Sequence, residues 1–329
     1  MGRWIIRLAS LATSFLVVAG LAAVWGWAAF TKPGPLAAPA AVVVPRGAGL
    51  EAIGNRLAQA GVIAEPTLFA IVAKITGKAR GLKAGEYLFP AAVSAHDALG
   101  IIERGETVVR RLTLAEGLTS VQALAVLAAA EGLVGDTGAA PPEGSLLPET
   151  YHYSWGDERP ALLRRMQHSM DAAIARLWAE RAPGLPLDTP EQAVILASIV
   201  ERETGVDAER GLVAGVFVNR LKRGMRLQSD PTVAYGIAGG AGLDRALTRA
   251  DLQADTPYNT YTIAGLPPGP ICNPGLASLR AVLNPAATDY LYFVADGTGG
   301  HAFAKTLDEH NRNVRAWRRL QRVPTSDSE

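Results

Sequence analysis

The stretch that decides the architecture of this chain is Ala197-Ser198-Ile199-Val200-Glu201-Arg202-Glu203-Thr204-Gly205, an apolar run that ends in two carboxylates. Upstream, Thr189 is followed by a proline and, three positions on, by a glutamine, which is the pattern of a capped helix start. Residues 193–200 contain one polar residue, and a helix that is apolar on all sides is normally buried. Gly205 is expected to end the helix in a left-handed conformation. The sequence therefore predicts a buried helix with two acids in its last turn.

These two acids point to different sides of the predicted helix. Residues two positions apart on a helix lie roughly 200° apart, so Glu201 and Glu203 cannot share a face. Glu203 continues the strongly apolar stripe of Leu196 and Ile199. Burial and the negative end of the helix dipole both raise the pKa of a carboxyl group placed there. Glu203 is therefore the predicted acid catalyst and Glu201 a supporting acid; the alternative is a solvated pair of acids on a fraying helix end.

The first thirty residues differ from the rest of the chain. Residues 8–30 carry no charge and exceed the roughly 20 residues that a helix needs to cross a bilayer. Arg3 and Arg7 precede this run and only Lys32 follows closely, so the charge bias predicts a cytoplasmic N-terminus and an extracytoplasmic remainder. A cleaved signal peptide is the alternative, although its apolar region is usually shorter.

Composition narrows the classes of function. Lys and Arg total 32 and Asp and Glu total 31, a balance that argues against an extended nucleic-acid surface. Cys272 is the only cysteine, so no disulfide can form within the chain. The five histidines fall in no metal-binding motif, and neither a metal nor another cofactor is expected.

The pattern along the chain predicts an α+β protein. Residues 42–92 read as strand, helix, helix, strand, an order that resembles a LysM-like glycan-binding module. The expected parts are an anchor at 1–30, a Pro/Ala-rich linker at 31–41 that lifts the following part off the membrane, the LysM-like subdomain at 42–92, a second small α+β subdomain at 93–140 and a catalytic domain at 141–329.

Six motifs in the second half occur in order and at close spacing. They are Ala197–Thr204, Phe217–Leu221, Met225–Val233, Tyr258–Tyr261, Gly265–Ile271 and Tyr290–Gly297. The series resembles the YceG-like family of endolytic murein transglycosylases. The resemblance implies cleavage of the β-1,4 bond between MurNAc and GlcNAc in nascent peptidoglycan, with release of a 1,6-anhydro-MurNAc end and with Glu203 as the catalyst. It also implies glycan strands as substrate and the peptidoglycan synthases of the elongation machinery as partners.

A mechanism with one acid is consistent with these residues. Glu203 would protonate the glycosidic oxygen and then accept the proton of the 6-hydroxyl of the sugar as that oxygen closes on the anomeric carbon. A hydrolase needs a second carboxylate, about 5–5.5 Å away as nucleophile or about 6.5–9.5 Å away to hold a water. Asp230 and Glu149 are the candidates, and both are also plausible loop caps. Glu149 stands where the family frequently has Asp, which makes an essential role for it less secure.

Uncharged polar side chains are expected to line the cleft. They are Asn219, Gln228, Tyr258, Asn259 and Tyr261. Each could instead turn a loop or pack in the interior. Three classes of function therefore remain open: a membrane-anchored lytic transglycosylase, a muramidase with two carboxylates, and a non-catalytic glycan-binding scaffold.

Overall fold

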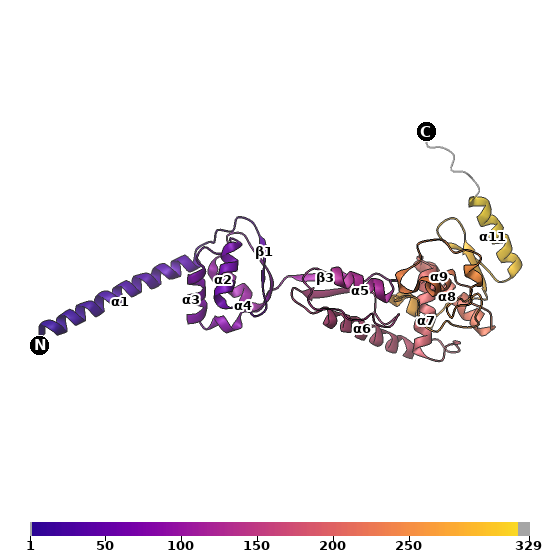
Figure 1. Cartoon of the computed structure of the whole chain (residues 1–329), viewed down its shortest axis with the longest axis horizontal. Helices are drawn as coiled ribbons and strands as arrows, with labels where there is room; N and C mark the ends of the chain where they lie inside the picture. Colours follow the sequence, from indigo (N-terminus) through magenta and orange to yellow (C-terminus); the bar gives the residue numbers. More distant parts are fainter. Residues whose placement is uncertain (1, 322–329) are drawn as a thin grey trace, which may run out of the picture. The chain divides into compact units, whose positions relative to one another are not determined.

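The computed structural model describes residues 2–321, with the side chains of residues 2, 3 and 5 excepted. The chain is a mixed α+β protein, as expected, and it divides into two compact units (Figure 1). Unit 1 comprises Met1–Arg110, Glu131–Val134 and His152–Asp157. Unit 2 comprises Arg111–Ala130, Gly135–Tyr151 and Glu158–Glu329.

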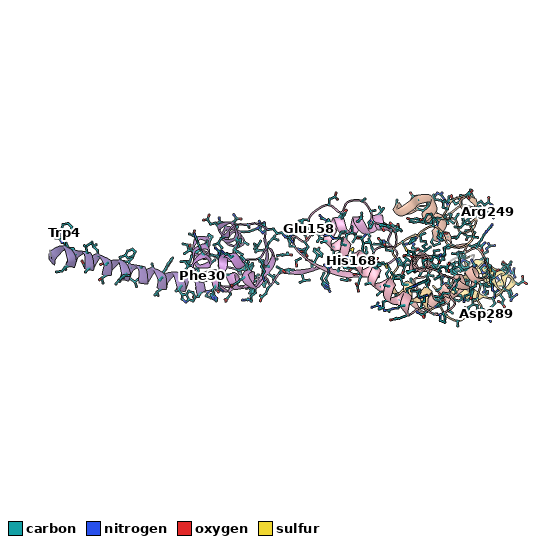
Figure 2. All side chains as sticks on the ribbon, turned by 90° about the horizontal axis from the view of Figure 1, so that it is seen from below. Trp4, Phe30, Glu158, His168, Arg249 and Asp289 are labelled. Atoms are coloured by element: carbon teal, nitrogen blue, oxygen red, sulfur yellow. The ribbon has the colours of Figure 1, made fainter. Side chains whose placement is uncertain are left out.

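The N-terminal helix α1 (Gly2–Thr31) is long and apolar enough over Ile6–Thr31 to cross a membrane. Most of its side chains are exposed, as a bilayer-spanning helix requires, but Phe30 at its end is 1% exposed. Figure 2 shows Trp4 and Phe30 at opposite ends of this helix, with Phe30 against the body of unit 1. The end of α1 is thus part of the core of unit 1.

The Pro/Ala-rich segment 31–41 is hydrogen-bonded to unit 1. The backbone N–H of Gly34 donates to the carbonyl of Val93 at 3.1 Å, and the N–H of Ala92 donates to the carbonyl of Leu36 at 2.8 Å. Burial of Phe30 already holds the chain against unit 1 when this segment begins. Gly34 and Leu36 are thus bound to the backbone at residues 92–93 of unit 1, and the role of the linker as a spacer above the membrane stays a prediction.

Unit 1 has the expected order of strand, helix, helix and strand. Its elements are β1 (Ala40–Val44), α2 (Leu50–Gln59), α3 (Pro66–Ile75), the 3₁₀ turn η1 (Lys78–Gly81), β2 (Gly85–Phe89) and α4 (Ala95–Arg104). β1 pairs with β2 antiparallel, with Ala40 opposite Phe89. The resemblance of this unit to a LysM module, and glycan binding by it, stay predictions.

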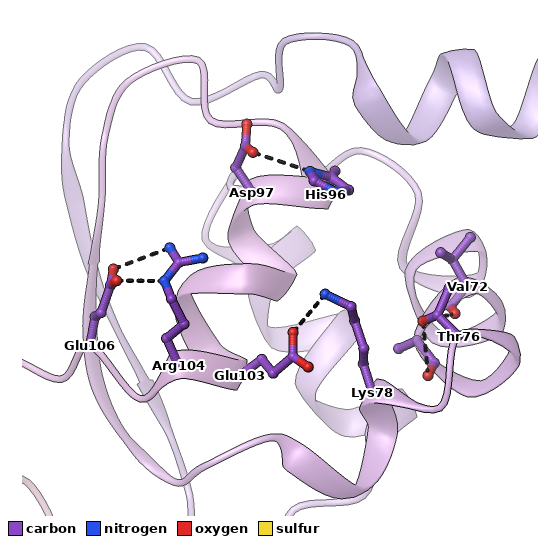
Figure 3. Close-up of polar contacts among 9 residues, drawn as sticks. Val72, Thr76, Lys78, His96, Asp97, Glu103, Arg104 and Glu106 are labelled. Atoms are coloured by element: carbon purple, nitrogen blue, oxygen red, sulfur yellow. Dashed lines mark hydrogen bonds and ion pairs between the residues drawn. The ribbon is translucent and has the colours of Figure 1, made fainter.

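Ion pairs link the surface elements of unit 1 (Figure 3). Lys78 contacts Glu103 at 2.7 Å and so joins η1 to α4. Arg104 contacts Glu106 at 2.6 Å just beyond the end of α4. Both pairs are partly or fully exposed, and pairs of this kind contribute at most about 1 kcal/mol each. The apolar core, not these contacts, holds the unit together.

The residues expected as a second subdomain, 93–140, do not form a unit of their own. α4 lies in unit 1, whereas α5 (Ser120–Ala129) lies in unit 2. Between them, β3 (Val109–Thr113) pairs with β4 (Thr150–Ser154), which comes from a later part of the chain. The pattern of neighbouring residues predicts strands and helices, but it cannot show that two strands far apart in the sequence pair with each other.

Unit 2 is built around the predicted apolar helix. Its elements after β4 are α6 (Arg159–Ala179), α7 (Pro190–Glu203), α8 (Asp207–Lys222), α9 (Asp230–Ala238), η2 (Gly239–Ala241), η3 (Asp251–Gln253), α10 (Leu276–Leu283), β5 (Tyr292–Ala295), β6 (His301–Ala304) and α11 (Leu307–Gln321). α7 packs against α6, α8, α9 and α10. Leu196, Ile199 and Val200 are completely buried, which confirms the central position of this helix.

Two local features of unit 2 differ from expectation. α7 ends at Glu203, and the extended backbone of the next residue, Thr204, closes the helix. The Thr204 hydroxyl accepts a hydrogen bond from the N–H of Val206 at 3.0 Å. Gly205 therefore does not adopt the left-handed conformation predicted for it. Asp230, a plausible loop cap in the sequence, is instead the first residue of α9, followed by Pro231 in its first turn.

Candidate active site

Glu203 is the last residue of α7 and its carboxyl group is partly buried. The hydroxyl of Ser229 donates a hydrogen bond to Glu203 Oε1 at 2.5 Å. Burial raises the pKa of Glu203 to about 7, and the nearby charge of Asp230 adds to this rise. The hydrogen bond from Ser229 is the main opposing effect, and the interactions with His301 and Arg220 also lower the pKa of Glu203. The carboxyl group can therefore both hold and release a proton near neutral pH.

Ser229, which sequence reasoning did not single out, is fixed in place by its own backbone. Its N–H donates to Thr260 Oγ1 at 2.9 Å, and its carbonyl accepts a hydrogen bond from Thr232 Oγ1 at 2.7 Å. The preceding residue, Gln228, has a φ of 50°, a left-handed conformation that costs a non-glycine residue energy. The side chain of Gln228 is exposed. The hydrogen bonds of Ser229 to Thr260 and Thr232 hold the residue whose hydroxyl donates to Glu203.

Asp230 and Tyr261 form a pair on the same side of Glu203. Asp230 is the first residue of α9, and the Tyr261 hydroxyl donates to Asp230 Oδ1 at 2.6 Å. Asp230 directly follows Ser229, whose hydroxyl donates to Glu203, and the charge of Asp230 contributes to the raised pKa of Glu203. The structure thus brings three of the predicted residues together: Glu203, Asp230 and Tyr261.

Glu201 faces away from this group, as its spacing predicts. Its Oε2 accepts a hydrogen bond from the N–H of Gly275 at 2.8 Å, and its Oε1 lies 3.7 Å from Arg210. Gly275 is the N-cap of α10, where a negative charge is favourable. The side chains of Glu201 and Arg210 are 5% and 7% exposed, so this is a buried ion pair. Glu201 therefore holds α10 against α7.

Both predicted asparagines use their side-chain amides on the protein backbone. Asn219 Nδ2 donates to the carbonyls of Thr288 and Tyr290, at 2.7 and 3.0 Å. Asn259 is completely buried, and its Nδ2 donates to the carbonyl of Ala254 at 2.7 Å. The amide hydrogens that a sugar could accept are thus already engaged in holding loops.

The other predicted residues are more dispersed. Tyr258 is partly buried, with its ring 4.9 Å from that of Tyr235. Glu149 is exposed at the residue before β4, and its carbonyl accepts a hydrogen bond from the N–H of Leu114. Within residues 2–321, no hydrogen bond or electrostatic interaction links the side chains of Glu149 and Glu203. Of the two candidate partner carboxylates, the structure places only Asp230 beside the acid.

The described part of the chain contains no cluster of histidine, cysteine, aspartate or glutamate that could hold a metal ion. Cys272 is completely buried, and burial raises the pKa of its thiol, so the thiol is inert as a nucleophile. A partly buried carboxyl group with a near-neutral pKa, beside a second carboxylate, is the arrangement of a general acid–base enzyme of the glycoside-cleaving kind.

The chain belongs to the YceG-like family, whose family profile matches residues 42–316. It is 41% identical to an endolytic murein transglycosylase of Bacillus subtilis strain 168 over 173 residues, which cover 52% of this chain and 47% of the relative. It is 32% identical to an endolytic murein transglycosylase of Streptococcus pneumoniae strain D39 over 320 residues, which cover 83% of this chain and 57% of the relative.

A solved structure is also similar to this chain. The crystal structure of a putative yceG-like protein from Listeria monocytogenes aligns with a TM-score of 0.51 and 30% identity, and covers 83% of this chain and 98% of the other. This supports the fold described above. The chain spans about half the length of the curated relatives that it matches.

Proposed function

We propose that this protein is an endolytic murein transglycosylase that cleaves the MurNAc–GlcNAc β-1,4 bond of nascent glycan strands and leaves 1,6-anhydro-MurNAc ends. The observation that carries the proposal is the state of Glu203, whose pKa is raised to about 7 by burial while Ser229 donates to its carboxylate. Its named relatives, both endolytic murein transglycosylases, support the choice of substrate and reaction.

In the proposed mechanism Glu203 acts twice. Protonated Glu203 first donates its proton to the glycosidic oxygen as the bond to the anomeric carbon breaks. The resulting carboxylate then accepts the proton of the 6-hydroxyl as that oxygen bonds to the same carbon. The carboxyl group ends protonated, so each cycle restores it and consumes no water. A pKa near neutrality lets one group serve both steps.

The second candidate is a muramidase that uses two carboxylates. Asp230 favours it, because its charge acts on Glu203 and it could direct a water or attack the sugar. The Tyr261 hydroxyl, however, donates to Asp230 and holds its carboxylate in place. In this position the negative charge of Asp230 helps to keep Glu203 protonated. We favour this second role for Asp230.

The test is mass spectrometry of uncrosslinked glycan strands digested by the wild-type protein and by Glu203→Gln. The full chain in detergent is the appropriate material, because Phe30 belongs to the core of unit 1 and a chain cut after α1 would lose it. We expect anhydro ends from the wild type and none from the variant. Reducing ends formed with uptake of water would favour the muramidase, and anhydro ends that survive the substitution would exclude Glu203 as catalyst.

We further propose that α1 anchors the protein once in the plasma membrane, with the N-terminus in the cytoplasm and both units outside it. The apolar length of α1 and the positive charges at its start support this arrangement. Peptidoglycan synthases are the proposed partners, on the ground of family membership. Protease protection in sealed vesicles tests the orientation, since digestion of unit 2 from the cytoplasmic side would reverse it.

A further inference from the structure

A cavity of about 300 Å³ in unit 2 lies next to the proposed acid. Its walls include Arg202, which precedes Glu203 in the chain, and Asp230, whose charge acts on Glu203. The lining also includes Gln122 at the start of α5 and Arg245 in the loop after η2. Glu203 itself is not part of the lining, so this cavity is a neighbouring site that opens beside the proposed cleavage point.

Most polar groups in this cavity are already paired. Arg245 contacts Asp251 through two hydrogen bonds, at 2.6 and 3.0 Å. Tyr235 donates its hydroxyl to Glu143 at 3.1 Å. The carboxylate of Asp230 accepts a hydrogen bond from Tyr261. These contacts shape the walls, and Asp251 already neutralises the charge of Arg245.

Two hydrogen-bond donors in the cavity remain available. Arg202 is exposed and forms no ion pair within residues 2–321; its one hydrogen bond there, to the carbonyl of Gly117, is long at 3.4 Å. Gln122 uses its Oε1 to accept from the N–H of Thr119, and no hydrogen bond within residues 2–321 uses its Nε2. A cation and an amide donor that face one cavity suit a ligand with an anionic oxygen acceptor.

The negative charges of the proposed substrate lie on its peptide stems. The sugar backbone of a peptidoglycan strand is uncharged, and its carboxylates belong to the peptide stem attached to the lactyl group of MurNAc. The stem nearest to the broken bond therefore starts at the sugar that reacts with Glu203. Asp230 would repel a carboxylate placed against it, which leaves the side of Arg202 and Gln122 for the stem.

We propose that this cavity binds the peptide stem of the MurNAc unit whose glycosidic bond is cleaved, with Arg202 pairing with a stem carboxylate and Gln122 Nε2 donating to the same stem. The proposal rests on the proposed function and specifies the substrate class further. Stem binding next to the acid would fix the register of the strand. The protein would then cleave strands with stems faster than strands without them.

The experiment compares uncrosslinked strands that carry their stems with strands from which an amidase has removed the stems. The formation of anhydro ends gives kcat/KM for each substrate with the full chain in detergent. The readout is the ratio of the two values, so a general loss of activity cancels. A charge-assisted hydrogen bond corresponds to a preference of about 10- to 100-fold for strands with stems in the wild type.

We expect Arg202→Gln to reduce this ratio close to one and Arg202→Lys to restore part of it. Arg176→Gln is the matched control, because Arg176 is also an exposed arginine in the last turn of a helix of unit 2. It should leave the ratio at the wild-type value. A wild-type ratio near one, or an equal ratio in Arg202→Gln and the wild type, would overturn the stem site.

A binding measurement separates this proposal from the proposed function. Isothermal titration of the Glu203→Gln protein compares a disaccharide with a stem peptide and the same disaccharide without one. If the protein prefers the disaccharide with a stem, and the double variant with Arg202→Gln loses this preference, the result supports stem binding in the cavity. This holds even if the wild type cleaves no strand. Equal binding of the two disaccharides overturns the stem site even if cleavage is confirmed.

Discussion

Ser229→Ala tests the hydrogen bond that the structure places on the proposed acid. The Ser229 hydroxyl donates to Glu203 Oε1 at 2.5 Å and lowers the pKa of Glu203 against the effect of burial. Ionised oxygen accepts such a bond more strongly than the neutral acid does, so removing the donor disfavours ionisation. The pKa of Glu203 should therefore rise above its present value of about 7.

The size of this rise follows from the strength of the bond. Hydrogen bonds to charged groups contribute about 1.5–3 kcal/mol, and one pKa unit corresponds to about 1.4 kcal/mol. Ser229→Ala is therefore expected to move the pKa of Glu203 upward by about one to two units. If Glu203 must be protonated to donate to the glycosidic oxygen, kcat/KM falls as pH rises through this pKa. The alkaline midpoint should lie near pH 7 in the wild type and about one to two units higher in the variant.

The assay is kcat/KM for anhydro-end formation between pH 5 and 10, with buffers of matched ionic strength. Ser278→Ala is the control, since Ser278 is a buried serine of unit 2 whose hydroxyl has no hydrogen-bond partner within the described residues. It should leave the midpoint unchanged. A midpoint in Ser229→Ala that stays at the wild-type value, or moves to lower pH, would refute the reasoning.

Three further predictions concern the carboxylates and a buried amide. Glu203 has a pKa of about 7 in the folded protein instead of the usual 4.5, so between these values the folded protein binds one proton more than the unfolded chain and loses stability as pH rises. The neutral side chain in Glu203→Gln avoids this loss. The free energy of unfolding of Glu203→Gln, measured in urea, should exceed that of the wild type by about 3 kcal/mol at pH 8 and should differ little at pH 4. Glu201→Gln should destabilise the protein by about 3–5 kcal/mol, because it removes one partner of the buried pair with Arg210 and weakens the cap at Gly275. The variant should still produce anhydro ends, and loss of product in a folded variant would give Glu201 a catalytic role. Asn259→Ala should lower the melting temperature, because it leaves buried carbonyls unpaired at a cost of about 1–3 kcal/mol each; an unchanged melting temperature would contradict this.

The sequence was sufficient to predict the central helix because the signal there is local. An apolar run with a capped start predicts burial, and the structure confirms that Ile199 and Val200 are completely buried. The spacing of Glu201 and Glu203 also predicted correctly that they would face different partners. Helix geometry alone fixes these relations, so no tertiary information was needed.

The rest of the site depends on contacts between distant parts of the chain. Ser229 contacts Glu203 across 26 sequence positions, and its backbone is held by Thr232 and by Thr260, which lies 31 positions further along the chain. The asparagines were predicted incompletely for a different reason. The residue type shows that a side chain can form hydrogen bonds, but it does not show which groups it bonds to. Asn219 and Asn259 were expected to face a sugar, and the structure instead shows both donating to backbone carbonyls. Only the folded chain determines which amides remain free.

Asp230 and Ser229 act on the same carboxyl group in opposite directions, and this opposition makes a one-acid mechanism testable. Asp230→Asn removes a negative neighbour and should lower the pKa of Glu203, whereas Ser229→Ala should raise it. The alkaline midpoint of kcat/KM should therefore move down in one variant and up in the other, while both still form anhydro ends. A muramidase that used Asp230 as nucleophile or base would lose its product in Asp230→Asn at every pH. If the midpoints shift in opposite directions and both variants still form anhydro ends, the role of Asp230 is to raise the pKa of Glu203. If Asp230→Asn forms no product, Asp230 is a catalytic partner.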